Sequence, residues 1–535
     1  MSKKKTENEL NRKAKRIQEP TFTPFYVNKK IVAALILFIE VVAIVVLAIL
    51  LANYVNTTIY FIISGVAILV LIPIVNSKMD PSYKITWLVL MVILPVFGAL
   101  LYILFANKKF TKREKKKMAG TMESLEKILS YSSTGVLSRI DPNKDPDAYS
   151  IGHYIRKYST TDIYNNTETT YYPWGEDAYP VMLEKLKQAK HYIYMEYFII
   201  QQGKFWNSIL EILKEKAKEG LDVRVIYDDM GCMKTLPNKY DDYLRSVGIK
   251  CVVFAPIRPF LDVRMNNRDH RKILVIDGHT GFTGGINLAD EYINEKIRFG
   301  KWKDNAIMLR GDGVFGLTSL FLTTWNRIRG ENIDDFTPYL PSTYAKETIP
   351  FKSDGLVQAY GSIPYTFETI GLNVYQDICF RAKKYLYIST PYLILNDEMA
   401  NAITMAAKNG VDVRLLTPHI PDNRVVFGIT RSYYKQLIEA GVKIYEYIPG
   451  FVHAKTFLAD DTLGTVGTIN LDYRSLFLHS ENGVFLYKTK SLKDIKNDFE
   501  ETFKVSKEIT LEMVKSLPIW YRFIIAFLRI FAPLL

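Results

Sequence analysis

Two segments of the chain carry the same polar pattern, H-x-K-x4-D-x6-G-x-x-N. The first contains His270, Lys272, Asp277, Gly284 and Asn287, and the second contains His453, Lys455, Asp460, Gly467 and Asn470. One H-x-K-x4-D match is a weak signal, because its residue types are common. Two copies with the same glycine and asparagine extension are far beyond chance, so both histidines are candidate catalytic residues.

This set of residues suits phosphoryl transfer. Side chains two residues apart in a strand share a face, so each motif places its histidine beside its lysine. The motif asparagine can return to the same point on the neighbouring strand. Lysine and asparagine side chains can bind the nonbridging oxygens of a phosphodiester, which gain charge as a nucleophile adds. One imidazole can attack phosphorus while the other protonates the leaving oxygen.

The two motifs are symmetric, so at this point either His270 or His453 can be the nucleophile. The expected phosphate-binding residues are Lys272, Lys455, Asn287 and Asn470. Asp277 and Asp460 complete the two catalytic motifs, and we expect structural rather than reactive roles for them. The sequence has no HExxH motif and no clustered carboxylates, so it predicts neither a metal site nor a cofactor.

Few other residues suggest chemistry. The remaining histidines are scattered, and we predict structural roles for His153, His191, His279, His419 and His479. Glu196 is a carboxylate in an apolar run, and both a site role and a structural role remain open for it. Three widely spaced cysteines exclude a disulfide scaffold.

The two motifs end the two copies of an internal repeat. GLDVRVIYD at 220–228 matches GVDVRLLTP at 410–418, and LRSVGIKCVVFAP at 244–256 matches LIEAGVKIYEYIP at 437–449. Each copy predicts alternating helices and apolar strands, with helix-ending glycines at Gly220, Gly248, Gly410 and Gly441. This plan favours α/β units with a largely parallel sheet in each half, and the halves should pair about a pseudo-twofold axis.

The net charge of +13 is concentrated beside apolar segments. Residues 1–30 carry nine Lys/Arg against three Glu, and residues 107–117 carry seven against Glu114. The rest of the chain is nearly neutral, which disfavours a nucleic-acid enzyme. Basic runs beside apolar segments are typical of contact with anionic lipid headgroups. The alternative is solvated charge with no partner.

Three apolar segments are each long enough to cross a membrane, namely 31–55, 57–75 and 85–106. We therefore predict transmembrane helices and a multi-pass protein. Both basic runs should be cytoplasmic, which requires an even number of crossings, so one segment is expected to be re-entrant or interfacial. Near the C-terminus, Arg522 and Arg529 share a helical face among aromatic residues, which indicates an interfacial amphipathic helix. The alternative is a core helix that closes the last domain.

The resulting organisation has seven parts. They are a basic cytoplasmic tail (1–30), membrane segments (31–106), a basic linker and connector (107–165), a first half (166–335), a linker (336–365), a second half (366–510) and the C-terminal amphipathic helix (511–535).

The duplicated motif resembles that of the phospholipase D superfamily, and the arrangement of the chain resembles the bacterial cardiolipin synthases within it. The resemblance covers residues 60–535 and includes GGINLADEY at 284–292, VGTINLDYRS at 466–475 and the final APLL. It implies two pseudo-twofold-related phospholipase D-like α/β/α halves with mixed sheets and one shared active site, preceded by N-terminal transmembrane helices. It also implies a location in the bacterial cell membrane.

The reaction implied by this resemblance transfers a phosphatidyl group from one phosphatidylglycerol to another through a phosphatidyl-histidine intermediate, giving cardiolipin and glycerol. Carried over to this chain, the expected nucleophile is His270 and the expected acid and then base is His453, and the symmetry of the motifs also permits the reverse order. The implied partners are phosphatidylglycerol and anionic membrane lipid rather than nucleic acid, and no oligomeric state is indicated. Downstream carboxylates orient the imidazoles in this family; Glu481 fits that position in the second half, and Asp304 is the candidate in the first. Many members have serine after the motif glycine, where this chain has Gly285 and Thr468, so the first half lacks a hydroxyl donor.

Two further enzymes remain as alternatives: a hydrolytic phospholipase D, and a phosphatidyltransferase that uses another alcohol such as serine. These differ only in which nucleophile reaches the covalent intermediate. A nuclease of the same superfamily is disfavoured by the membrane segments and by the neutral body of the chain. A membrane scaffold with a decayed site is disfavoured by two intact motifs.

Overall fold

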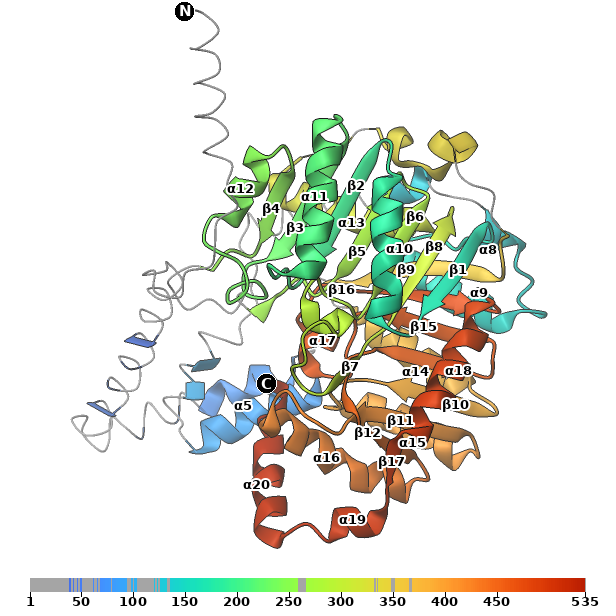
Figure 1. Ribbon diagram of the computed structural model, residues 1–535. Coiled ribbons are helices and arrows are strands. Elements are labelled where there is room, and N and C mark those ends of the chain that lie inside the picture. The colour runs from blue at the N-terminus through green and yellow to red at the C-terminus, as the bar shows by residue number, and fades with distance from the viewer. Residues whose placement is uncertain are drawn as a thin grey trace, which may run out of the picture.

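The computed structural model describes two α/β lobes, the first green and the second orange to red in Figure 1. The described residues are 135–257, 266–331, 335–347, 352–364 and 368–534, together with shorter stretches and single positions between 38 and 131. The predicted basic tail and the basic run at 107–117 lie outside these residues.

The first lobe is built on a seven-stranded sheet. Its strands in spatial order are β1 (Thr167–Tyr172), β8 (Ala306–Gly311), β6 (Thr280–Gly284), β5 (Lys272–Ile276), β2 (Tyr192–Tyr197), β3 (Asp222–Asp228) and β4 (Lys250–Phe254). Strands β2, β3 and β4 pair in parallel, and the remaining pairs are antiparallel. The helices of this lobe are α10 (Gly175–Lys187), α11 (Lys204–Lys218), α12 (Tyr240–Ser246) and α13 (Val314–Arg329).

The second lobe repeats this order and adds one edge strand. Its strands are β9 (Leu356–Ser362), β16 (Glu481–Tyr487), β15 (Leu463–Gly467), β14 (Thr456–Ala459), β10 (Tyr385–Ser389), β11 (Asp412–Pro418), β12 (Lys443–Tyr447) and β17 (Ser506–Ile509). Its main helices are α14 (Ile370–Arg381), α15 (Asp397–Lys408), α16 (Arg424–Glu439) and α18 (Ser491–Lys504). The predicted internal repeat is therefore confirmed.

The sheets are mixed, as the family resemblance implied. The expectation of largely parallel sheets is wrong beyond three neighbouring strands in each lobe, because β5–β6 and β14–β15 are hairpins whose short connections permit only antiparallel pairing. The helix-ending glycines are confirmed. Gly220, Gly248, Gly410 and Gly441 have φ values of 95°, 91°, 91° and 98°, which glycine adopts without steric cost.

Helices α13 and α18 join the lobes by packing across to the opposite sheet. Helix α13 contacts β9 of the second lobe, and α18 contacts β1 of the first. Polar contacts add to the buried apolar cluster at this boundary: the Tyr171 hydroxyl donates to Asp498 Oδ2 at 2.7 Å. The boundary is thus a shared core, which fixes the lobes relative to each other.

Two elements lie in ranges predicted to be connectors. Strand β9 forms one edge of the second sheet, although it falls within the predicted linker (336–365). Helix α9 (Pro146–Ser159) packs against α14, where Arg381 contacts Asp147 at 2.8 Å. The second lobe therefore begins before residue 366 and draws a helix from the segment ahead of the first lobe.

The described part of the N-terminal region lies beside the C-terminus. Helix α5 (Pro81–Ile93), blue in Figure 1, contacts the last turn of the chain, where the Thr86 hydroxyl donates to the carbonyl of Ile530 at 2.7 Å. Among the described residues, we find no helix with the length and apolarity needed to cross a membrane. The predicted segment 31–55 and part of 57–75 fall largely outside those residues, so the multi-pass prediction is not confirmed.

Candidate active site

The two motifs lie at matching hairpins of the two lobes. His270 precedes β5, Lys272 begins it, and Asn287 follows β6. In the second lobe, His453 and Lys455 precede β14, and Asn470 follows β15. All of these side chains are buried, and the two histidines are 7% and 6% exposed. Burial makes electrostatic contacts at this site stronger than in water.

The motif aspartates hold the hairpins in place. Asp277 adopts a left-handed φ of 51°, and its carboxylate accepts the backbone N–H groups of Lys190, His191 and Tyr192 at 2.8, 2.8 and 2.9 Å. Asp460, with φ of 55°, does the same for Lys383, Lys384 and Tyr385 at 2.6, 2.8 and 2.9 Å. These contacts tie each hairpin to the start of the central strand and suit the structural role we expected.

We predict that Asp277→Ala lowers the free energy of unfolding by about 1–3 kcal/mol, because it removes acceptors from partly buried N–H groups. The kcat of the folded protein should change much less than in the histidine variants. Urea unfolding and a lipid-transfer assay measure the two effects. Asp277→Asn is the matched control, since asparagine tolerates left-handed backbone. A thousandfold loss of kcat at unchanged stability would contradict the structural role.

Each catalytic imidazole is bound by a carboxylate from the other lobe. His270 Nδ1 lies 2.9 Å from both oxygens of Glu481, and His453 Nδ1 lies 2.6 Å from Asp304 Oδ2. Both carboxylates are fully buried. Because each carboxylate engages Nδ1, the Nε2 atom of each ring is left for chemistry.

Backbone hydrogen bonds between the lobes place each carboxylate beside the histidine of the opposite lobe. The N–H of His270 donates to the carbonyl of Ser480 at 2.8 Å, and the N–H of His453 donates to the carbonyl of Lys303 at 2.7 Å. Strands β7 (Lys301–Lys303) and β13 (Gly450–Val452) form a small parallel sheet at the second of these crossings. The residue after each accepting carbonyl is the carboxylate that binds the histidine.

The carboxylates Glu481 and Asp304 explain why the first lobe has Gly285 where many family members have serine. Thr468 donates its hydroxyl to Glu481, whereas the first lobe has Gly285 at the matching position. A Cβ added to Gly285 would lie 2.0 Å from Asp304 Oδ1. The shorter aspartate therefore occupies the space where a hydroxyl-bearing side chain would stand.

Burial sets the charge state of the imidazoles. Desolvation lowers the pKa of His270 to about 3; Glu481 opposes this shift and Lys272 adds to it. Desolvation likewise lowers the pKa of His453 to about 4. Lys272, from the other lobe, is among the charges that lower the pKa of His453, so the two motifs act on each other. Both rings are neutral near pH 7 before an anion binds.

Each motif lysine bonds to the backbone of its own motif histidine. Lys272 Nζ donates to the carbonyl of His270 at 2.6 Å, and Lys455 Nζ donates to that of His453. Burial lowers the pKa of Lys272 to about 8 and that of Lys455 to about 7. An anion placed between them would favour their charged forms.

The side chains of the two motif asparagines differ in their hydrogen bonds. The amide of Asn287 accepts from the N–H of Ile199 at 3.1 Å and donates to the Tyr292 hydroxyl at 2.7 Å. The Asn470 Oδ1 atom is buried without a hydrogen-bond partner. This oxygen can only accept a hydrogen bond, so Asn470 would contact a phosphate oxygen through its NH2 group.

Glu196 lies beneath the site. It is fully buried on β2, 3.8 Å from Arg271 Nη1, and neither of its oxygens has a hydrogen-bond partner. Burial, and then the charge of Asp269, raise its pKa well above the usual range. These surroundings favour a neutral carboxyl on β2 opposite β5, the strand that begins two residues after His270.

A third imidazole, which the sequence analysis placed among structural histidines, stands beside His270. The His479 ring lies 5.7 Å from the His270 ring, and its Nδ1 is 3.6 Å from Glu481 Oε1. Its position two residues before Glu481 is the signal that could have identified it, since such side chains share a face. Around the other histidine, Tyr292 and Trp302 pack at ring distances of 5.4 and 5.5 Å.

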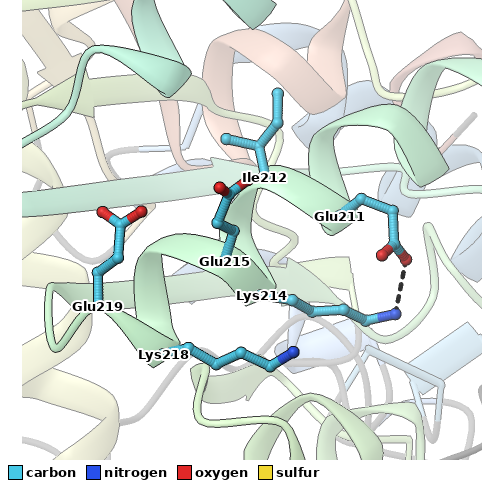
Figure 2. Close-up of a pocket in the computed structure, with 6 residues that line it drawn as sticks. All are labelled: Glu211, Ile212, Lys214, Glu215, Lys218 and Glu219. Atoms are coloured by element: carbon cyan, nitrogen blue, oxygen red, sulfur yellow. Dashed lines mark hydrogen bonds and ion pairs between the residues drawn. The ribbon is translucent and has the colours of Figure 1, made fainter.

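A hollow on the outside of the first lobe is unrelated to this site. It lies along α11 and is lined by charged side chains with Ile212 (Figure 2). Lys214 pairs with Glu211 there at 2.7 Å, and no motif residue lines it.

Two α/β lobes with exchanged histidine–carboxylate pairs define a phospholipase D-like enzyme. The family model for the cardiolipin synthase PLD-like domain matches residues 182–297 and 378–503, and a phospholipase D-nuclease N-terminal model matches 65–107. The chain belongs to the cardiolipin synthase family. It is 36% identical to the cardiolipin synthase of Alkalihalophilus pseudofirmus, covering 85% of this chain and 89% of that one.

Other relatives agree. Cardiolipin synthase 2 of Bacillus anthracis is also 36% identical, over 85% of this chain and 87% of its own. An uncharacterized protein of Streptococcus mutans is 42% identical over 86% of this chain and 98% of its own. A crystal structure of phosphatidylserine synthase from Haemophilus influenzae has a TM-score of 0.52 at 15% identity, over 72% of this chain and 98% of that one. This last likeness supports the fold alone.

Proposed function

We propose that the protein transfers a phosphatidyl group from one phosphatidylglycerol to another, releasing glycerol and forming cardiolipin. The observation that carries the proposal is the exchange of carboxylates between lobes, which builds two oriented imidazoles into one buried site. Membership of the cardiolipin synthase family supports the choice of phosphatidylglycerol. The site residues and their roles are part of this proposal.

In the first step, His270 Nε2 attacks phosphorus and the bond from phosphorus to the glycerol oxygen breaks. His453 gives its proton to that oxygen, and glycerol leaves. Binding of the phosphodiester anion raises the pKa of His453 and thereby supplies this proton at neutral pH. Lys272, Lys455 and the amide of Asn470 hold the nonbridging oxygens as their charge grows.

In the second step, the glycerol hydroxyl of another phosphatidylglycerol gives its proton to His453 and its oxygen attacks phosphorus. The P–N bond to His270 breaks, and the site returns to its starting state. One phosphodiester replaces another, so the exchange needs no energy source. Water in place of the second lipid would yield phosphatidic acid instead.

Incubating the purified protein with phosphatidylglycerol alone tests the proposal. We expect cardiolipin and free glycerol in equal amounts, measured by mass spectrometry and a coupled glycerol assay. Phosphatidic acid as the main lipid product would show a hydrolase. Formation of phosphatidylserine only when serine is added would show a transferase with another acceptor.

We predict that the fall of kcat/KM for phosphatidylglycerol with rising pH becomes steeper as pH passes through about 7 to 8. Lys455 and Lys272, whose pKa values burial lowers to about 7 and about 8, then lose the charge that binds phosphate. Bound phosphate favours the protonated lysines and His453, so the alkaline limb of kcat should lie at higher pH than that of kcat/KM. Rate profiles in mixed micelles measure both limbs, and coincident limbs would contradict the prediction.

We also propose that the chain is anchored in the bacterial cell membrane through its N-terminal apolar segments and that α20 (Ile519–Arg529) lies on the membrane surface. Ile525 of α20 is buried beside Gly428 of α16, and the Arg529 guanidinium lies 3.9 Å from the Tyr433 ring centre. The outward face carries exposed Trp520 and Phe523, which are 65% and 73% exposed. A helix that only closed the core would not present this face.

Brominated phospholipids test the position of α20. In nanodiscs, they should quench a fluorescence component that is present in the unmodified protein and absent from Trp520→Phe. Equal quenching of the two proteins would contradict membrane contact at this helix.

A further inference from the structure

Three potential metal ligands meet at the first catalytic histidine. One ligand atom each from His270, His479 and Glu481 lies within 4.8 Å of the other two. The sequence predicted no metal site because His270 lies 211 residues from Glu481 and joins it only when the lobes pair. The three groups come from both lobes, so the cluster exists only in the assembled site.

His479 has no other evident partner for its nitrogens. Both ring nitrogens are buried without a hydrogen bond, and the side chain is 10% exposed. Its Nδ1 faces Glu481 Oε1 at 3.6 Å, which is too long for a hydrogen bond. Buried imidazole nitrogens are normally hydrogen-bonded or bound to metal, so this ring is placed to bind a ligand.

We propose that His270, His479 and Glu481 bind a zinc-class divalent ion that switches the enzyme off. The switch rests on the proposed role of His270 as nucleophile. The ion would take the place of the contact between His270 Nδ1 and Glu481, so that the ring is no longer oriented by the carboxylate. With the ion on Nδ1, the neutral ring would carry its proton on Nε2, which would then have no lone pair for the attack on phosphorus.

The ligand chemistry indicates which ion fits. Two imidazoles and one carboxylate form a three-ligand zinc set that leaves a fourth position open. Hard cations such as magnesium and calcium prefer sites made of oxygen ligands, so they should bind here weakly. The other catalytic histidine has no such set among the described residues around it, because Trp302 stands where the second lobe has His479.

The experiment compares zinc response and cobalt binding in three forms of the full-length protein. The forms are the unmodified protein, His479→Phe and His419→Phe. Because the nitrogens of His479 make no hydrogen bond, phenylalanine removes the ligand without leaving a broken contact. His419 also contacts a buried glutamate, Glu446, at 2.9 Å, but Arg431 rather than a second imidazole completes that group, so it is the matched control.

Zinc should lower phosphatidyl transfer by the unmodified protein at least tenfold, and EDTA should restore it. With each variant's rate expressed relative to its own zinc-free rate, His479→Phe should need at least tenfold more zinc than the unmodified protein for the same fractional loss of transfer. His419→Phe should respond to zinc like the unmodified protein. Cobalt should give a visible d–d absorption band that His479→Phe lacks. His479→Leu, with a smaller side chain, serves the same comparison if the phenylalanine variant does not fold.

Equal zinc sensitivity of the unmodified protein and His479→Phe would overturn the proposal. Cobalt binding through His479 without inhibition by zinc would support the metal site but contradict its proposed role in switching the enzyme off. Absence of any lipid transfer would instead refute the proposed function, and the cobalt spectrum would still decide whether the metal site exists.

Discussion

Replacing either His270 or His453 with alanine should lower phosphatidyl transfer by roughly four orders of magnitude or more. In the proposed mechanism, one ring attacks phosphorus and the other transfers protons, and no neighbouring group can take over the Nε2 atom of either ring. The double variant should be little worse than either single variant, because residues that act as a unit are not additive. Cardiolipin formation from phosphatidylglycerol measures the loss, and thermal unfolding confirms that each variant is folded.

A substrate with a better leaving group separates the roles of the two histidines. In a phosphatidyl ester of p-nitrophenol, the leaving oxygen departs without needing a proton. His453→Ala should therefore regain the first step and release nitrophenol, whereas His270→Ala should not. His419→Ala, at a histidine that contacts Glu446 rather than a carboxylate of the site, is the control and should resemble the unmodified protein. The reverse pattern would assign the nucleophile to His453, and rescue of neither variant would contradict the paired-imidazole mechanism.

The sequence predicted those parts of the fold that repeat. Matching segments around 220–228 and 410–418 became equivalent strands β3 and β11, and the glycines that end the helices have the expected backbone. Local patterns suffice here, because apolar alternation and helix ends depend on neighbouring residues. The same patterns did not predict β9, whose place at a sheet edge depends on pairing with β16, far along the chain.

Motif spacing identified the residues within each motif, and the family resemblance named Glu481 and Asp304 as candidate orienting carboxylates, but neither indicated which histidine each carboxylate contacts. His270 and Lys272 are fixed by one strand, so their spacing identified them. The partner of His270 is Glu481, which reaches it through backbone pairing between lobes. The spacing of residues within one half does not show that its histidine contacts a carboxylate of the other half. His479 was missed for the same reason, since its importance comes from the His270 ring beside it.

Replacing the orienting carboxylates should cost about a thousandfold to ten-thousandfold in kcat, as loss of the carboxylate does in other buried histidine–carboxylate pairs. In Glu481→Gln, the side chain loses its negative charge and its NH2 group can donate to His270 Nδ1, so the ring loses its preferred tautomer. In Asp304→Asn, the same applies to His453. The measurement is cardiolipin formation, with thermal unfolding as the test of folding, because a buried amide here also costs stability.

The exchange between lobes makes a further, directional prediction. Glu481 orients the proposed nucleophile from the other lobe, so Glu481→Gln should stay impaired with the p-nitrophenol ester. Asp304 orients the proposed acid, so Asp304→Asn should regain nitrophenol release, as His453→Ala does. Glu446→Gln, at a buried glutamate that contacts His419, is the matched control and should leave the rate per folded molecule near normal. If each carboxylate served the histidine of its own lobe, Glu481→Gln would be the variant that is rescued, and the arrangement of the site described above would be wrong.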